Sequence, residues 1–184
     1  MNILMRFSIK AKLGLLLGLS TASLVVVLAL AAAFLHQRMM ADRIGKLRAV
    51  VDTAHSLAAS LEGEVEKGKL TRDEAIARLR IPLHAMRFDQ GDGYLTLNRF
   101  DGISLIHGAN PKQEGDQRNG VLDTHGTSMS SEQIRVAKTQ GEGTVTIYYP
   151  KPQQTEALQK ILYVKAFTPW EAVFSGCLRR RHRS

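Results

Sequence analysis

The hydrophobic residues of this chain follow several patterns in succession, and the first is an unbroken apolar run from Leu13 to Leu35. An α-helix needs about 20 apolar residues to cross the bilayer core of roughly 30 Å, and in lipid such a segment must be helical. Basic residues precede the run, and positive charge marks the cytoplasmic side of a span. We therefore expect a cytoplasmic N-terminus over residues 1–12, a transmembrane helix over 13–35 and an extracytoplasmic remainder.

A cleaved signal peptide is the alternative interpretation of this run, because Ala29, Ala31 and Ala33 could form a cleavage site. The apolar core of a signal peptide is usually about 7–15 residues long. The run is longer, which favours a retained anchor. Under either interpretation the remainder is exported, to the periplasm if the source is a bacterium.

After the apolar run, hydrophobic positions recur every three or four residues from Ile44 to Val65. This spacing is typical of a coiled coil or of a long packed helix. The helix either lies on the chain's own sheet or pairs with a second copy, and both can hold on different faces. A helix over about residues 37–66 would be roughly 45 Å long and continuous with the transmembrane helix.

A second helix is predicted after Gly68, which ends the first one. Thr71 and Glu74 have the spacing of a capping box, and Pro82 would kink the helix or end its first part. One face of this helix carries Ala75, Ile76, Leu79, Leu83 and Met86.

From Gly93 onward the apolar and polar residues alternate, as they do in strands. Tyr94, Thr96 and Asn98 fall on one face of the first strand, and Asp101-Gly102 is a hairpin signal. Further strands are expected at Ile103 to His107, Gly143 to Tyr149, Lys160 to Phe167 and Ala172 to Ser175, with a loop over Asn110 to Ser131 and a short helix at Glu132 to Thr139. Two helices followed by about five antiparallel strands predict an α+β domain.

The net charge of +8 does not indicate a nucleic-acid partner. Of the 25 basic residues, three precede the apolar run and four lie in the last six positions, which leaves 18 against 17 acidic residues. A nearly neutral body lacks the charge that a polyanion requires. About 140 residues remain for one exported core, and the single cysteine, Cys177, excludes an intrachain disulfide.

Catalytic and metal-binding motifs are absent from the sequence. There is no nucleophile elbow, no phosphate-binding glycine loop and no histidine spacing typical of a metal site. We therefore predict no enzyme activity, no cofactor and no metal.

The exported part resembles the single Cache sensor domain (Cache type 2) of bacterial methyl-accepting chemotaxis proteins, over roughly Leu47 to Gly176. The resemblance rests on short motifs in the family's order: Gly68-Lys69-Leu70-Thr71, Glu74-Ala75, Arg87, Gly93-Tyr94, Asn98, Asp101-Gly102, Leu105-Ile106-His107, Gly115, Asp123, Gly126, Gly141, Gly143, Pro150-Lys151-Pro152, Lys160, Tyr163-Val164-Lys165, Phe167 and Pro169-Trp170. It implies a periplasmic ligand-sensing domain over residues 36–177, with a PAS-like antiparallel sheet. The ligand, commonly a small organic anion such as a short carboxylate, would lie on the sheet face away from the long helix.

The chain departs from the family in three places. Gly108 stands where the family usually has proline, and Ile147 where it often has an aromatic residue. The family continues into a second membrane span, whereas here an atypical basic tail follows over residues 178–184. Its arginine density is typical of out-of-frame translation of a GC-rich gene, so we expect a truncated receptor without its own cytoplasmic output.

Five residues are candidates for binding the anion. Arg87 could hold a carboxylate with two hydrogen bonds, or be a solvated charge at a helix end. Tyr94 and His107 could line the site, or pack and hydrogen-bond structurally. Tyr149 and Lys165 are further candidates, although strand alternation could point either of them outward.

These observations predict the ligand-sensing part of a chemoreceptor-like transducer, a single-pass protein of the bacterial inner membrane. It would form a homodimer or pair with a full-length receptor through the Ile44 to Val65 helix. The alternative is a membrane-anchored or secreted periplasmic binding protein that acts through a partner receptor. An exported hydrolase is a third hypothesis.

Overall fold

A computed structural model describes residues 8–150 and 157–179 of the chain; the side chains of 149–150, 157–158 and 178–179 lie outside this description. The chain divides into two compact units, residues 1–43 and 44–184. The first helix, α1 (Ile9–Glu66), runs through this division without a break. The expected continuity between the apolar run and the following amphipathic helix is therefore confirmed.

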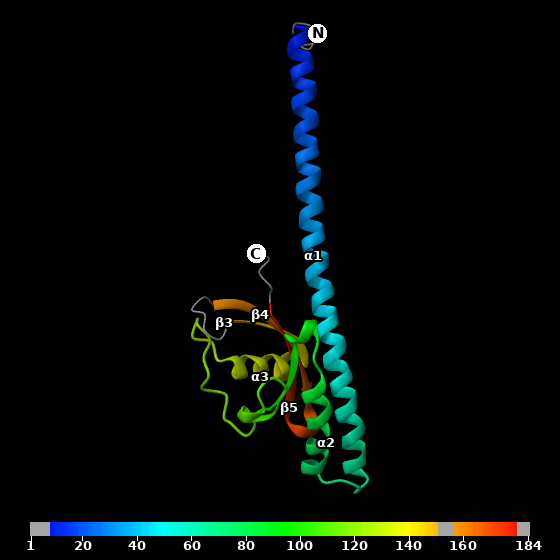
Figure 1. Cartoon of the computed structure of the whole chain (residues 1–184), viewed down its shortest axis with the longest axis vertical. Helices are drawn as coiled ribbons and strands as arrows, with labels where there is room; N and C mark the ends of the chain where they lie inside the picture. Colours follow the sequence, from blue (N-terminus) through cyan, green and yellow to red (C-terminus); the bar gives the residue numbers. More distant parts are fainter. Residues whose placement is uncertain (1–7, 151–156, 180–184) are drawn as a thin grey trace. The chain divides into compact units, whose positions relative to one another are not determined.

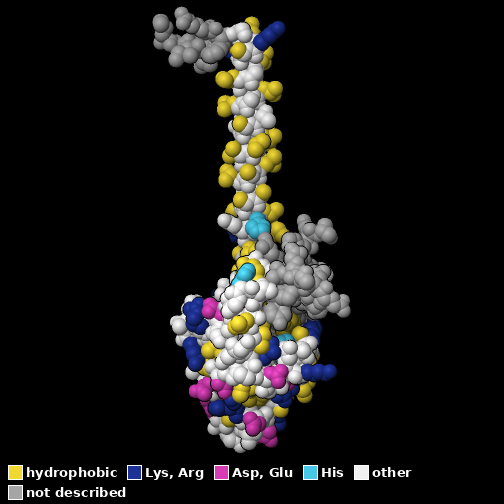
Figure 2. All heavy atoms as spheres, turned by 90° about the vertical axis from the view of Figure 1, so that its left-hand side faces the viewer, with side chains coloured by type: hydrophobic (Ala, Val, Ile, Leu, Met, Phe, Trp, Pro, Cys, Tyr) yellow, Lys and Arg dark blue, Asp and Glu magenta, His cyan; other side chains and the backbone are white. Residues whose placement is uncertain are grey.

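In the first unit, the described part of α1 is exposed along nearly its whole length. On the face seen in Figure 2, its side chains are mostly hydrophobic, while the second unit carries charges of both signs. The apolar stretch of this helix has no buried residues. Thr21 Oγ1 donates to the Leu17 carbonyl oxygen at 2.6 Å, so this hydroxyl is satisfied within the helix. By length and composition, α1 can cross a membrane.

The second unit is built on a five-stranded antiparallel sheet in the order β2-β1-β5-β4-β3. The strands are β1 (Tyr94–Arg99), β2 (Ser104–His107), β3 (Glu142–Pro150), β4 (Ala157–Phe167) and β5 (Ala172–Arg179). The α+β prediction with about five strands is confirmed. The last strand is longer than expected and continues past Ser175, because Leu178 and Arg179 still pair with β4.

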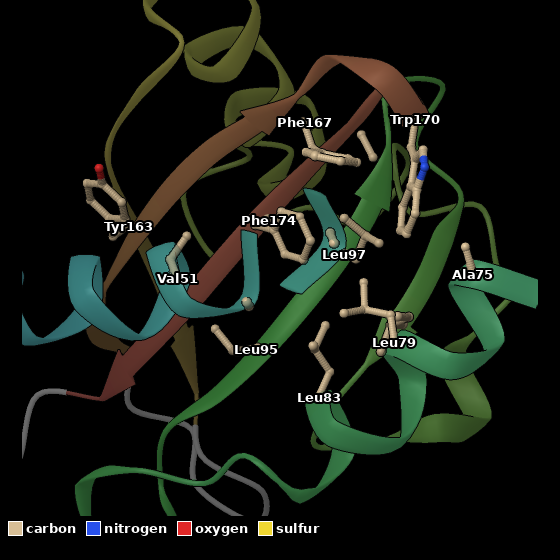
Figure 3. Packing of buried hydrophobic residues seen from close by; sticks show 14 of the residues in the cluster. Val51, Ala75, Leu79, Leu83, Leu95, Leu97, Tyr163, Phe167, Trp170 and Phe174 are labelled. Atoms are coloured by element: carbon tan, nitrogen blue, oxygen red, sulfur yellow. The ribbon is translucent and has the colours of Figure 1, made fainter. Parts of the chain in front are cut away.

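One face of the sheet packs against the C-terminal part of α1 and against α2 (Arg72–Ala85). Figure 3 shows Leu83 of α2 and Val51 of α1 near side chains of β1 and β5. The core on this face consists of Leu47, Val51, Ala54, Ala58, Leu70, Ala75, Leu79, Leu83, Leu95, Leu97, Ile106, Tyr163, Phe167, Trp170, Ala172 and Phe174. The heptad positions of α1 are therefore packed on the chain's own sheet, the first of the two expected arrangements.

The other face of the sheet is covered by α3 (Met129–Gln140), which lies across the sheet from α1 and α2 in Figure 1. Ile134, Val136 and Ala137 of this helix pack on apolar residues of β3, β4 and β5. The helix begins three residues before the predicted Glu132, because Ser128 caps it by accepting the Ser131 N–H at 3.3 Å.

The predicted helix and turn signals have the expected geometry. Glu74 N–H donates to Thr71 Oγ1 at 3.3 Å, and Thr71 N–H donates to Glu74 Oε2 at 2.8 Å, which is the capping box of α2. Pro82 does not end this helix, contrary to one of the two expectations, and the helix continues to Ala85. At the β1–β2 hairpin, Gly102 has a φ of +93°, a conformation that favours glycine.

Candidate functional site

A cavity of about 260 Å³ lies on the sheet face that α3 covers. The strand residues in its wall alternate with residues of the α1 face: Thr96 and Asn98 of β1 face the cavity, whereas Leu95 and Leu97 belong to the opposite core. The wall is formed by Tyr94, Thr96, Asn98, His107, Ala109, Asn110, Gln113, Arg118, Val121, Met129, Ser130, Gln133, Ile147, Lys160, Leu162, Ser175 and Cys177. The sheet, α3 and the 109–121 segment thus form its wall together.

The charged side chains of the cavity are basic. Lys160 of β4 is only 9% exposed, Arg118 of the covering segment is half-buried, and His107 ends β2. Among the described residues that form the wall, none is aspartate or glutamate. Lys160 is buried, and the described part of the wall contributes basic groups and no carboxylate, a composition that favours an anionic occupant because charge-assisted hydrogen bonds are strong at low dielectric.

The ring of His107 is oriented by its backbone neighbours. Asn110 N–H donates to His107 Nδ1 at 3.0 Å, so the neutral ring carries its proton on Nε2. The ring is stacked on Tyr94, with centroids 5.3 Å apart. Burial lowers the pKa of His107 below 6.5, and the positive charges of Arg118 and Arg87 lower it further. His107 therefore offers a neutral N–H donor that can become charged when an anion arrives.

Neutral polar groups and apolar side chains complete the wall. Thr96 Oγ1 and Ser175 Oγ are hydrogen-bonded to each other at 2.7 Å across β1 and β5. Ser130 and Gln133 of α3 also line the cavity. The apolar part of the wall consists of Ala109, Val121, Met129, Ile147 and Leu162. A small ligand with one anionic end and an apolar body matches this composition.

Glu114 holds one edge of the cavity against α2. Its Oε1 accepts the His107 N–H at 2.9 Å and lies 2.6 Å from His84 Nε2, and its Oε2 lies 2.8 Å from Arg80 Nε. Burial alone would raise the pKa of Glu114, but the His107 N–H, His84 and Arg80 together lower it. The carboxylate is thus kept ionised, and it fixes the strand end and the turn that carry His107 and Asn110.

The structure brings together two of the five residues proposed from sequence, Tyr94 and His107. Lys165 lies on the opposite face of the sheet, where its Nζ is 2.5 Å from Asp52 Oδ1 of α1. Arg87 is exposed and is not part of the cavity wall. Lys165 and Arg87 therefore do not line this cavity, while the side chain of Tyr149 lies outside the described residues.

Sequence reasoning missed Lys160, Arg118 and Gln133 as cavity residues. The alternation of β4 bears on one of them, Lys160. Lys160 and Lys165 are an odd number of positions apart, so their side chains must point to opposite faces of the sheet. The neighbouring strands decide which of the two lysines points into the cavity, and this cannot be derived from the sequence of β4 alone. Arg118 lies in a segment without regular spacing, so no pattern pointed to it.

Clusters that could hold a metal are not found in the part of the chain that the structure describes: no three His, Cys, Asp or Glu side chains converge there. The arrangement is an antiparallel sheet with a long helix on one face and, on the other, a cavity whose described wall carries basic side chains.

Comparison with known proteins gives the family. The chain belongs to the family described as Single Cache domain 2, whose profile matches residues 39–178. It is 31% identical over 170 residues to the methyl-accepting chemotaxis protein McpP of Pseudomonas putida, an alignment that covers 92% of this chain and 31% of the relative. The chain therefore spans about a third of the length of that chemoreceptor.

Solved structures share the fold. A structure described as the periplasmic sensor domain of a chemotaxis protein is 31% identical, with a TM-score of 0.71 over 78% of this chain and 99% of that one. A Cache chemosensory domain described for its carboxylic acid recognition is 26% identical, with a TM-score of 0.71 over 79% of this chain and 99% of that one. A methyl-accepting chemotaxis protein of Vibrio parahaemolyticus, 19% identical, has a TM-score of 0.60 over 78% of this chain and 92% of that one, and shows the fold alone.

Proposed function

We propose that this chain is the ligand-sensing part of a chemoreceptor-type transducer and that it binds a short carboxylate in the cavity beneath α3. The observation that carries the proposal is the buried Lys160 ammonium group, accompanied by His107 and Arg118 in a wall that contains no acidic residue among those described. Carboxylic acid recognition by a related Cache domain supports the same ligand class.

The proposed topology follows the apolar pattern of α1. Residues 13–35 would cross the inner membrane, residues 1–12 would lie in the cytoplasm, and residues 36–177 would form the periplasmic sensor. A relative described as a periplasmic sensor domain supports this placement. We further propose that the sensor works as a homodimer or beside a full-length receptor. A ligand would then act by binding one arrangement of the sheet and α1 more tightly than another.

A thermal-shift screen of the purified chain in detergent tests the ligand class. The panel contains short carboxylates, amino acids and amines. A carboxylate at about 100 times its dissociation constant should stabilise the protein by roughly 2.7 kcal/mol. Amines should give no shift, because the wall offers cations rather than carboxylates. Stabilisation by amines alone would contradict the proposal.

Lys160→Met and Lys165→Met make a matched pair on β4. A hydrogen bond to a charged group contributes about 1.5–3 kcal/mol, so Lys160→Met should weaken carboxylate binding roughly 10- to 150-fold. Lys165→Met removes the contact with Asp52 on the α1 face and should leave the affinity nearly unchanged. Equal effects of the two substitutions would remove Lys160 from the proposed site. Arg87→Gln is a second control with an expected small effect.

A further inference from the structure

The segment that carries Arg118 is tied to the turn of the β1–β2 hairpin. Arg118 N–H donates to the Gly102 carbonyl oxygen at 2.9 Å. The neighbours of the arginine, Gln117 and Asn119, both donate to the Asp101 carbonyl oxygen, from Nε2 at 2.9 Å and from Nδ2 at 3.0 Å. Asn119 N–H also donates to Gln117 Oε1 at 3.1 Å, which joins the two neighbours to each other. We call these two side chains the amide clamp.

The hairpin turn is shaped to receive the amide clamp. Gly102 is buried and has a φ of +93°, and an added Cβ would overlap the oxygen atoms of both amide groups. The Asp101 side chain fixes the turn itself, because its Oδ1 accepts the Ile103 N–H at 3.1 Å and its Oδ2 accepts from Arg99 Nε at 2.8 Å. The carbonyl group that the clamp holds is therefore fixed in direction.

Exposure alternates along this segment. Gln117 and Asn119 are exposed and are not among the described residues of the cavity wall, whereas Arg118 between them is half-buried and lines the cavity. The segment has no regular secondary structure, so its order depends on contacts such as the clamp. Ordering a loop upon binding costs free energy, and a loop that is ordered beforehand avoids this cost.

We infer that Gln117 and Asn119 are positioning residues, which hold the Asp101 carbonyl group so that the Arg118 guanidinium group reaches the occupant of the cavity. The inference rests on the carboxylate site proposed above. The amide clamp acts on the affinity through Arg118 and touches no ligand itself. Its loss therefore weakens binding while the core of the second unit stays intact.

Calorimetric titration of the full chain in detergent with acetate, propionate and butyrate tests the inference. Asn119→Leu removes one amide at similar volume, and Gln117→Leu removes the other. Each should weaken binding by about 2- to 13-fold, the change that the net contribution of one hydrogen bond produces. Gln140→Leu, at an exposed position at the end of α3, is the matched control and should bind as the wild type does. The unfolding temperature should be nearly the same in all three variants.

A double-mutant cycle with Arg118→Gln separates positioning from support of the fold. In the Arg118→Gln background, Asn119→Leu should leave the affinity nearly unchanged, because the clamp then has no guanidinium group to position. In the Lys160→Met background, Asn119→Leu should weaken binding by the same factor as in the wild type, because Lys160 belongs to β4 and not to the clamped segment.

The outcomes separate this inference from the proposed function. An equal loss of affinity in the wild-type and Arg118→Gln backgrounds would overturn the inference, because the amides would then act on the fold as a whole. Wild-type affinity in both Asn119→Leu and Gln117→Leu would overturn it too and would leave the carboxylate site intact. Binding of none of the three acids to the wild type would contradict the proposed function, and the inference with it.

Discussion

Two lysines of β4, Lys160 and Lys165, have different surroundings and therefore different roles. Lys160 and Lys165 lie on the same strand, yet one lines the cavity and the other pairs with Asp52 and Glu142 on the α1 face. The second lysine belongs to a cluster with Arg48, which also pairs with Glu142 and Asp52. This cluster joins α1 to β3 and β4, so Lys165 has a structural role at the helix–sheet contact.

We expect the histidine of the cavity to make the proposed carboxylate binding dependent on pH. Burial and nearby arginines hold the pKa of His107 below 6.5 in the free protein. An anion beside the ring stabilises the imidazolium and raises this pKa, so binding takes up a proton. The affinity should therefore increase as the pH falls from the pKa of the complex to that of the free protein, and level off outside this interval.

Calorimetry between about pH 8 and about pH 6, in buffers of different ionisation enthalpy, measures this linkage. We expect the wild type to take up a fraction of a proton that grows as the pH falls, with tighter binding at the acidic end. His107→Gln should abolish the uptake. Proton uptake that persists in this variant would assign the linkage to another group.

At the scale of the elements, Gly108 shows how β1 and the end of β2 fit together. Its N–H donates to the Leu95 carbonyl oxygen at 2.9 Å. A Cβ at this position would lie 2.7 Å from the same oxygen and 3.3 Å from that of Leu83. Proline, usual here in the family, lacks the N–H and carries a Cβ, so this chain joins the two strands by a contact that proline cannot make.

Gly108→Ala should therefore destabilise the second unit by about 1–3 kcal/mol, the usual cost of overpacking. Gly63→Ala in α1 is the matched control, because nothing lies within 4 Å of its added Cβ. Alanine is a better helix former than glycine, so this control should gain about 0.5–1 kcal/mol. Denaturant unfolding of the two variants beside the wild type measures both changes. A neutral Gly108→Ala variant would mean that the backbone relaxes around the methyl group.

The pattern of apolar residues predicted most elements because each depends on local signals. The capping box of α2, the alternation in β1 and the hairpin at Asp101-Gly102 need only neighbouring residues. The strand order does not: β1 lies between β2 and β5, and its pairing with β5 joins segments far apart in sequence. The cavity depends on that pairing, since Thr96 meets Ser175 there. For this reason the place of Ser175 in the polar wall could not be assigned from sequence.

At the scale of the whole molecule, cysteine labelling tests the proposed topology. With Cys177→Ser as the background, Ser60→Cys places a thiol on an exposed position of α1 in the second unit, and Ala11→Cys places one before the apolar run. A membrane-impermeant maleimide should label Ser60→Cys in cells with a permeabilised outer membrane, and Ala11→Cys only after lysis.

Other results would contradict the proposed topology. Labelling of both sites only after lysis would contradict an exported sensor. Recovery of a protein that begins near residue 36 would show that the apolar run is a cleaved signal sequence rather than an anchor. The sensor fold itself would be unaffected by that result, because the family match begins at residue 39.

Strand β5 separates the cavity from α1 by the thickness of one backbone. Ser175 and Cys177 face the cavity, while at Gly176 between them an added Cβ would lie 3.0 Å from Val51 Cγ2 of α1. Side chains can absorb a small displacement by changing rotamer, but a bare main chain has no such freedom. The Val51 and Leu47 side chains of the helix therefore pack directly on the main chain of β5 at Gly176, and we expect any shift of this strand by an occupant of the cavity to reach the helix through that contact.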